Sequence, residues 1–468
     1  MEKDKGRHKL VYDYYETRIL FGFYKYGDSL PSIAQICSDF HLGRRSVRTA
    51  LAMLEKEGYI KNEERKQAVT VFQADSTQVA ENMARYYVPR KEGILDFAKA
   101  GDYLFVPLWE GAMRRIGKES WKKMQYDLSN TTLDAMPLSL KFYVSVLAAW
   151  ENRLVLNLLA EGLRYLRYPY LIEKKSSVLT SPELLNMKQD EAVSSLKSRI
   201  EDSDSCLRQE LFDYIDQVSP KYDLGDQKPI PFRWNIYRQR PQMRYTLASL
   251  IIWEIMSKKI PAGSYLPSLP EMEQQYGVSR TTIRRTLALL EELGITRSFQ
   301  GKGTQVWLEP GKIDFSKSEI REGMRLYQES LQLLALTIFQ VSRLTLGSLP
   351  HRRWENLRKE LEQIRTEKHS FFCFEVFFRF IRKECPLAAV RECYSKLAEL
   401  VVWGYPFTMF QFKEERLDTV YAGRLKQMER HLEKEELTAF CEDWERLLEG
   451  EEQRSREFAW QMGEPKSV

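Results

Sequence analysis

The stretch from Leu266 to Leu308 constrains the fold of this 468-residue chain more than any other. Ser268 is a favourable N-cap residue and Glu271 follows it three positions later, so the pair predicts a capping box at the start of a short helix. We expect Gly277 to end that helix at positive φ and Ser279 to cap a second helix. The stretch therefore begins as two helices joined by a tight turn.

The second predicted helix has one apolar and one basic face. Ile283, Leu287 and Leu290 recur at helical spacing and predict a buried stripe. Arginines near the start of a helix oppose its dipole in the free protein, whereas a phosphate backbone would favour them. We therefore expect the other face to contact DNA through Ser279, Arg280, Thr281, Thr282, Arg284 and Arg285.

Two short apolar runs flank a glycine-rich turn at the end of this stretch. Residues 295–299 and 304–308 have strand character, and residues 300–303 lie between them. The pattern predicts a β-hairpin with Lys302 and Gly303 at its basic tip. Such a tip suits the edge of a DNA groove, so we include both residues among the candidate contacts.

The order of these features resembles the DNA-binding domain of the GntR family of bacterial transcription regulators. The resemblance rests on Leu266-Pro267-Ser268, Tyr276 to Arg284, Leu290 to Ile295 and Gly301 to Thr304. It implies a recognition helix in the major groove and a wing tip at the minor groove. Family members often have Glu-Arg after Leu-Pro-Ser, where this chain has Leu269-Pro270, so one expected contact is missing.

The N-terminal segment repeats the pattern. Leu30 to Ser32 aligns with Leu266 to Ser268, and Gly43 to Arg48 aligns with Ser279 to Arg284, both at an offset of 236 residues. The spacing of Val47, Leu51 and Leu54 repeats the apolar stripe. The corresponding candidate DNA contacts are Arg44, Arg45, Ser46 and Arg48.

This first copy is less regular than the second. Gly43 replaces the capping serine, and Ser32 with Gln35 forms the glutamine version of the capping box. The wing region at 62–68 lacks glycine and contains two carboxylates, so we expect a divergent, acidic wing. Its arginines either bind DNA or form a solvated face in a head that is retained for packing.

The rest of the chain has a helical pattern without convincing strand alternation. The fold class is therefore mainly α: two winged helix-turn-helix domains with small β-wings, each followed by an all-helical bundle. We expect a first winged helix at 1–75, a first bundle at 76–218, a proline-containing linker at 219–242, a second winged helix at 243–310 and a second bundle at 311–468. Trp121 and Trp354 repeat at nearly the head offset, which indicates a tandem duplication.

The first bundle resembles the helical effector domain of FadR-like GntR regulators, many of which hold a metal ion through an aspartate and histidines. Ser139 and Tyr143 occupy the matching positions here, and Phe378 does so in the second bundle. None of these restores the ligand set, so we predict no metal and no cofactor. The many phenylalanines at 371–380 indicate a core or an interface between bundles, with an apolar ligand cavity as the alternative.

Composition limits the class of protein. The net charge is +5, and residues 1–73 and 240–310 each have an excess of three positive charges, as phosphate binding requires. The six cysteines lack metal-binding spacing and predict buried free thiols. The polar N-terminus and the absence of a long apolar run predict a cytoplasmic protein without membrane contact. No catalytic motif is present, so we do not expect an enzyme.

These features predict a sequence-specific transcription regulator that acts as a single-chain pseudo-dimer on paired half-sites of double-stranded DNA. The alternative is a one-headed DNA binder whose first head and bundles form a protein-interaction scaffold. Sensing of a small-molecule effector by the bundles is a further hypothesis. Self-association of the chain is a further candidate interaction.

Overall fold

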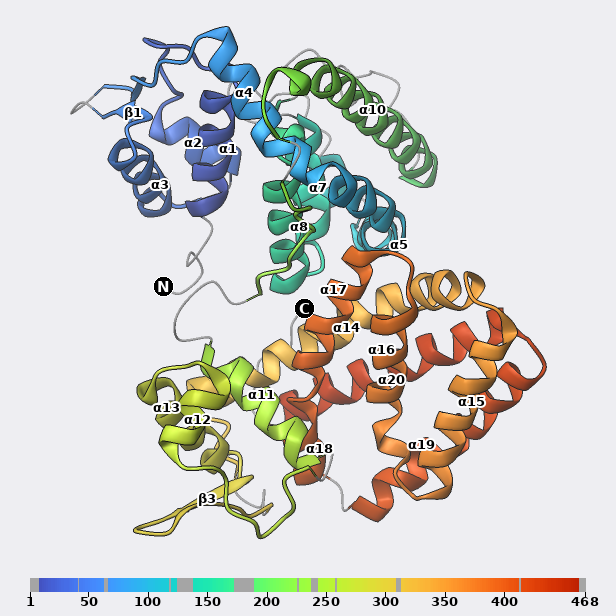
Figure 1. Ribbon diagram of the computed structural model, residues 1–468. Helices are drawn as coiled ribbons and strands as arrows, with labels where there is room; N and C mark the ends of the chain where they lie inside the picture. Colours follow the sequence, from blue (N-terminus) through green and yellow to red (C-terminus); the bar gives the residue numbers. More distant parts are fainter. Residues whose placement is uncertain are drawn as a thin grey trace. The chain divides into compact units, whose positions relative to one another are not determined.

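The computed structural model divides the chain into two compact units, Met1–Arg233 and Trp234–Val468. Each unit contains a small head with one two-stranded sheet and a larger set of helices (Figure 1). The prediction of a mainly α fold with small β-wings is confirmed. The structure describes residues 8–40, 42–62, 66–117, 119–123, 138–171, 189–224, 227–236, 243–256, 259–308, 313–411 and 414–462.

The second head begins with three helices: α11 (Met243–Met256), α12 (Leu269–Tyr276) and α13 (Arg280–Glu292). Both α11 and α12 pack against α13. The Glu271 carboxylate accepts hydrogen bonds from the backbone N–H and the hydroxyl of Ser268 at 2.8 and 2.7 Å, which closes the predicted capping box. Gly277 ends α12 at φ +62°, and the Ser279 side chain caps α13, both as predicted.

A β-hairpin follows α13 and forms the wing. Its strands are β3 (Thr296–Phe299) and β4 (Gly303–Val306), which pair antiparallel. Gly301 and Gly303 adopt φ of +73° and +105°, which a residue with a side chain rarely adopts. The Lys302 N–H donates to the Phe299 carbonyl at 3.1 Å and closes the turn. The hairpin extends away from α12 and α13 (Figure 1).

The first head repeats this order with α1 (His8–Leu20), α2 (Ile33–Phe40), α3 (Arg44–Lys56), β1 (Ile60–Lys61) and β2 (Val69–Thr70). The weaker capping signals in the sequence of the first head correspond to weaker helix caps in its structure. No side chain caps α3, because Gly43 holds the N-cap position. The Ser32 hydroxyl accepts from the Gln35 N–H at 3.2 Å, but the Gln35 side chain bonds with Asp39 rather than returning to the cap.

The helices after the first head are α4 (Ser76–Tyr87), η1 (Val88–Arg90), α5 (Lys91–Arg115), α7 (Leu138–Ala148), α8 (Arg153–Leu166), η2 (Tyr168–Leu171) and α10 (Gln189–Val218). Helix α1 of the head packs on α8 and η2. Two ion pairs join these surfaces, Arg164 with Asp13 and Arg167 with Glu16, the latter at 2.9 Å. The first head is therefore fixed to its own bundle by largely buried charged pairs.

The second bundle consists of α14 (Ser318–Gly347), α15 (His351–Thr366), η6 (Ser370–Phe372), α16 (Cys373–Glu384), α17 (Ala388–Val401), α18 (Gly404–Gln411), α19 (Glu414–Glu433) and α20 (Leu437–Gln461). Helix α14 packs along α20, and α15 packs along α19. Phe377 and Phe378 of α16 are fully buried, and the Phe377 ring stacks on Trp444 with centroids 4.2 Å apart. These phenylalanines belong to the bundle core.

Part of the segment predicted as a linker, residues 219–242, packs on the first bundle. Residues 219–221 form the short helix η4. The Ile230 N–H donates to the Pro89 carbonyl at 2.7 Å, and the Phe232 ring lies 4.3 Å from the Phe97 ring. The segment therefore contacts the first bundle at these positions and is not a free coil over its whole length.

All six cysteines are thiols outside disulfides, as predicted. The expectation that they are buried is wrong for Cys206, which is exposed on the charged helix α10, and Cys37 is only half-buried. Among the described residues, no group of three or more His, Cys, Asp or Glu side chains could hold a metal ion. The Ser139 side chain lies outside the described part. None of the described helices combines the length and apolar character needed to cross a bilayer.

Candidate nucleic-acid interface

The second head presents α13 with its apolar side inward. Ile283 and Leu290 are fully buried and Leu287 is 9% exposed, so the predicted stripe is confirmed. Thr281, Arg284 and Arg285 are exposed on the other side of the helix. Among the described residues, neither Arg284 nor Arg285 forms an ion pair. Both guanidinium groups can therefore reach a phosphate or a base without breaking an internal contact.

The start of α13 is more constrained. Ser279 and Thr282 share a hydrogen bond between their hydroxyls at 3.0 Å, which occupies both side chains with capping. Arg280 pairs with Glu273 of α12 at 2.8 Å, with the two side chains 52% and 31% exposed. An ion pair at this exposure contributes only about 0–1 kcal/mol. A DNA phosphate can therefore replace Glu273 as the partner of Arg280.

Substituting Glu273→Gln is expected to strengthen DNA binding. The change releases Arg280 from its internal partner. It should raise the affinity for DNA by up to about fivefold, which corresponds to the free energy that an exposed ion pair contributes. Glu291→Gln is the matched control, because it removes the same charge from the exposed face of the same head without freeing Arg280. Titration of labelled duplex DNA measures both variants. Equal gains would show that net charge, not the Arg280 pair, sets the affinity.

The wing adds one predicted and one unpredicted cation. Lys302 is exposed at the hairpin tip between Gly301 and Gly303. Arg297 of β3, which the motif comparison missed, is also exposed, and its guanidinium lies 5.1 Å from the centre of the Trp307 ring. A cation over an aromatic ring is held in place while its outer face stays in solvent. The signal that could have identified Arg297 was a basic residue within the predicted wing strand at 295–299.

The first head presents a similar helix. Arg44, Arg45 and Arg48 of α3 are exposed, and none forms an ion pair within the described part of the chain. Ser46 is only 5% exposed, so its hydroxyl is less accessible to DNA than the three arginines. It lies one turn before Ala50, which is fully buried, on the same helical face. Residues 63–65 of the predicted acidic wing lie outside the described residues.

The sequence comparisons agree with this geometry. A model of the bacterial regulatory proteins of the gntR family matches residues 8–69 and again residues 246–306. Both heads are GntR-family domains. The chain contains the GntR domain twice, and each match covers a head with its helices and wing. The repetition agrees with a tandem duplication, and the two domain matches indicate a transcription regulator.

Individual relatives cover parts of the chain. The HTH-type transcriptional regulator YhcF of Bacillus subtilis is 29% identical over 104 residues, which is 22% of this chain and 86% of that protein. Among solved structures, GntR of Streptococcus agalactiae is 16% identical, covering 45% of this chain and 98% of its own, with a TM-score of 0.21. A GntR regulator from Rhodococcus sp. RHA1 is 14% identical, covering 46% and 97%, with a TM-score of 0.26.

Proposed function

We propose that this GntR protein binds double-stranded DNA as a single-chain pseudo-dimer, with one head on each of two half-sites. The observation that carries the proposal is the repeated surface: each head exposes arginines of the helix that follows its turn, and these arginines, apart from Arg280, lack ion-pair partners among the described residues. Ordinary dimers place two identical heads on a palindrome. One chain with two heads can serve the same purpose alone.

The two heads should prefer different sequences. The second head offers Thr281, Arg284 and Arg285, whereas Arg45 and Arg48 occupy the positions of Thr281 and Arg284 in the first head. Arginine contacts guanine through two acceptors in the major groove, while threonine contacts the thymine methyl or a single acceptor. Unlike side chains at matching positions therefore favour an operator made of two unlike half-sites.

Selection from a random duplex pool with the intact protein tests this proposal. We expect the recovered sequences to contain two different half-sites at one fixed spacing. Recovery of a single half-site would contradict the two-headed arrangement. A perfect palindrome would contradict it as well, because identical half-sites indicate that two chains use the same head and that the protein self-associates on DNA.

A one-headed DNA binder is the second candidate. The burial of Ser46 reduces the contact surface of the first head. The start of its wing is also engaged internally, since Asn62 donates from its backbone and side chain to the Glu55 carboxylate at 2.8 and 2.9 Å. In this arrangement the first head and the bundles serve as a protein-interaction scaffold. Selection would then recover one half-site, and that half-site would depend on the second head.

A further inference from the structure

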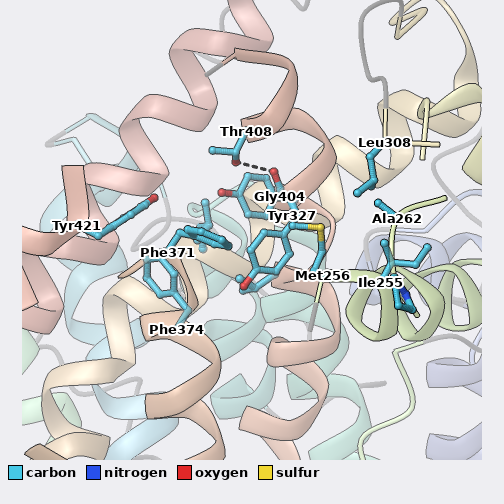
Figure 2. Close-up of a pocket in the computed structure, with 14 residues that line it drawn as sticks. Ile255, Met256, Ala262, Leu308, Tyr327, Phe371, Phe374, Gly404, Thr408 and Tyr421 are labelled. Carbon is cyan, nitrogen blue, oxygen red and sulfur yellow. Dashed lines mark hydrogen bonds between the residues drawn. The ribbon is translucent and has the colours of Figure 1, made fainter. Parts of the chain in front are cut away.

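A cavity of about 480 Å³ lies within the second unit, between its head and its bundle (Figure 2). Ile255 and Met256, the last residues of α11, form part of its wall together with Ala262 and Leu308 of the head. The opposite wall comes from the bundle. A volume of this size accommodates a small organic molecule.

The bundle side of the cavity is aromatic. Phe371 and Phe374 supply apolar faces, and Tyr327, Tyr405 and Tyr421 supply rings with hydroxyl groups. Burial raises the pKa of all three tyrosines above the ordinary value, so their hydroxyls are protonated and neutral near pH 7. These residues offer aromatic stacking together with neutral hydrogen-bonding groups.

Among the residues that the structure describes, the lining contains no Lys, Arg, His, Asp or Glu side chain. Behind the lining, Glu451 accepts a hydrogen bond from Tyr421 at 2.7 Å and pairs with Arg454. These charges therefore compensate each other. Placing an ionised ligand in such a cavity would leave its charge without a partner, which is costly. The cavity thus favours an uncharged, aromatic or otherwise apolar molecule with at most a few hydroxyl or carbonyl groups.

The head wall of the cavity is connected to the recognition helix. Glu254 precedes the lining residues Ile255 and Met256 in α11, and its carboxylate accepts a hydrogen bond from Tyr276 at 2.8 Å. Tyr276 is the last residue of α12, directly before the turn into α13. Leu308, where the chain leaves the wing, adopts φ +51°, a strained value for leucine. A bound molecule that displaces these residues therefore acts on the end of α11 and on the residue that follows the wing.

We propose that this cavity is a binding site for a neutral aromatic small molecule and that its occupancy changes the DNA affinity of the second head. The regulatory half of this proposal rests on the proposed function, because it requires that the second head bind DNA. The binding half does not. The site differs from the interior of either bundle because the head supplies one of its walls.

Fluorescence titration of the intact protein tests the binding half. The probe is N-phenyl-1-naphthylamine, an uncharged aromatic dye, and 1-anilinonaphthalene-8-sulfonate has the same ring system with an added sulfonate. We expect the neutral dye to bind one site per chain and at least about tenfold more tightly than the sulfonate, since the cavity offers no counter-charge. Equal affinities or non-saturable binding of the neutral dye would overturn the site.

Two tryptophan variants locate the dye. Ala262 is exposed in a turn at the edge of the cavity, so Ala262→Trp should fold normally. The tryptophan should fill the cavity from its rim and weaken binding of the neutral dye by about tenfold or more. Val420→Trp is the matched control, because Val420 is 42% exposed beside Tyr421 but is not a lining residue. It should leave dye affinity unchanged. Equal affinity in the two variants would overturn this location.

The regulatory half is tested by linkage with a duplex recovered by selection. If saturating dye changes the DNA dissociation constant by some factor, the duplex must change the dye dissociation constant by the same factor. We expect a reciprocal change that disappears in Ala262→Trp. Dye binding without any effect on DNA affinity would overturn regulation while leaving the site intact. A failure of DNA binding itself would overturn the proposed function and the regulation, whereas the dye titration would still decide the site.

Discussion

Replacing Arg284 with alanine is expected to weaken binding to a selected duplex by about 1–3 kcal/mol, or roughly 5- to 150-fold. Arg284 is exposed on α13, opposite the buried stripe of Ile283 and Leu290, and has no ion-pair partner among the described residues. Its loss should therefore leave the fold unchanged and remove a DNA contact. If the contact is a phosphate, the slope of log affinity against log salt should fall by about 0.9.

Arg424→Ala is the control for this experiment. Arg424 is also an exposed arginine without an ion-pair partner among the described residues, but it lies on α19 of the bundle. The variant removes the same charge and should leave affinity within about twofold, because distant exposed charges are screened by salt. Equal losses in Arg424→Ala and Arg284→Ala would mean that general electrostatics, not α13, accounts for the effect.

Replacing Phe377 with alanine should reduce the free energy of unfolding of the second unit by about 3–5 kcal/mol. The side chain is fully buried and stacks on Trp444. Its removal leaves a cavity between α16 and α20 that rigid helices fill only in part. Urea unfolding followed by circular dichroism measures the loss. Hydrogen exchange resolved by peptide should assign it to Trp234–Val468.

Phe380→Ala is the matched control, because Phe380 lies on the same helix and its ring is parallel to that of Phe377 at 6.4 Å, but it is only half-buried. We expect this change to reduce the free energy of unfolding by about 1 kcal/mol. A loss as large as that of Phe377→Ala would contradict the assignment of Phe377 to the core. So would a Phe377→Ala loss distributed equally over both units.

Local signals made the second head predictable. The bond between Ser268 and Glu271, the positive φ of Gly277 and the cap by Ser279 each depend on residues close in sequence. For Ser46, the alignment with Thr282 predicts an exposed side chain, whereas the helical spacing from Ser46 to the buried Ala50 predicts the low exposure that the structure has. That spacing was available in the sequence.

Contacts between distant residues could not be predicted in this way. Arg164 and Asp13 are far apart in the chain, yet their pair fixes the first head to its bundle. The cavity likewise joins Met256 of one helix to Tyr421 of another, and only the packing of head against bundle creates it. The phenylalanine-rich segment allowed either a core or a cavity, and Phe377 lies in the core whereas Phe374 lines the cavity.

Nuclease footprinting of a selected duplex tests the central claim most directly. The intact protein, Arg48→Ala and Arg284→Ala are compared at the protein concentration at which the control variant Arg424→Ala saturates the duplex. A covalent pseudo-dimer predicts protection over two adjacent half-sites, with one half-site lost in Arg48→Ala and the other lost in Arg284→Ala. Protection of a single half-site that depends on Arg284 and is indifferent to Arg48 would contradict the two-headed account and assign the first head to packing or partner binding.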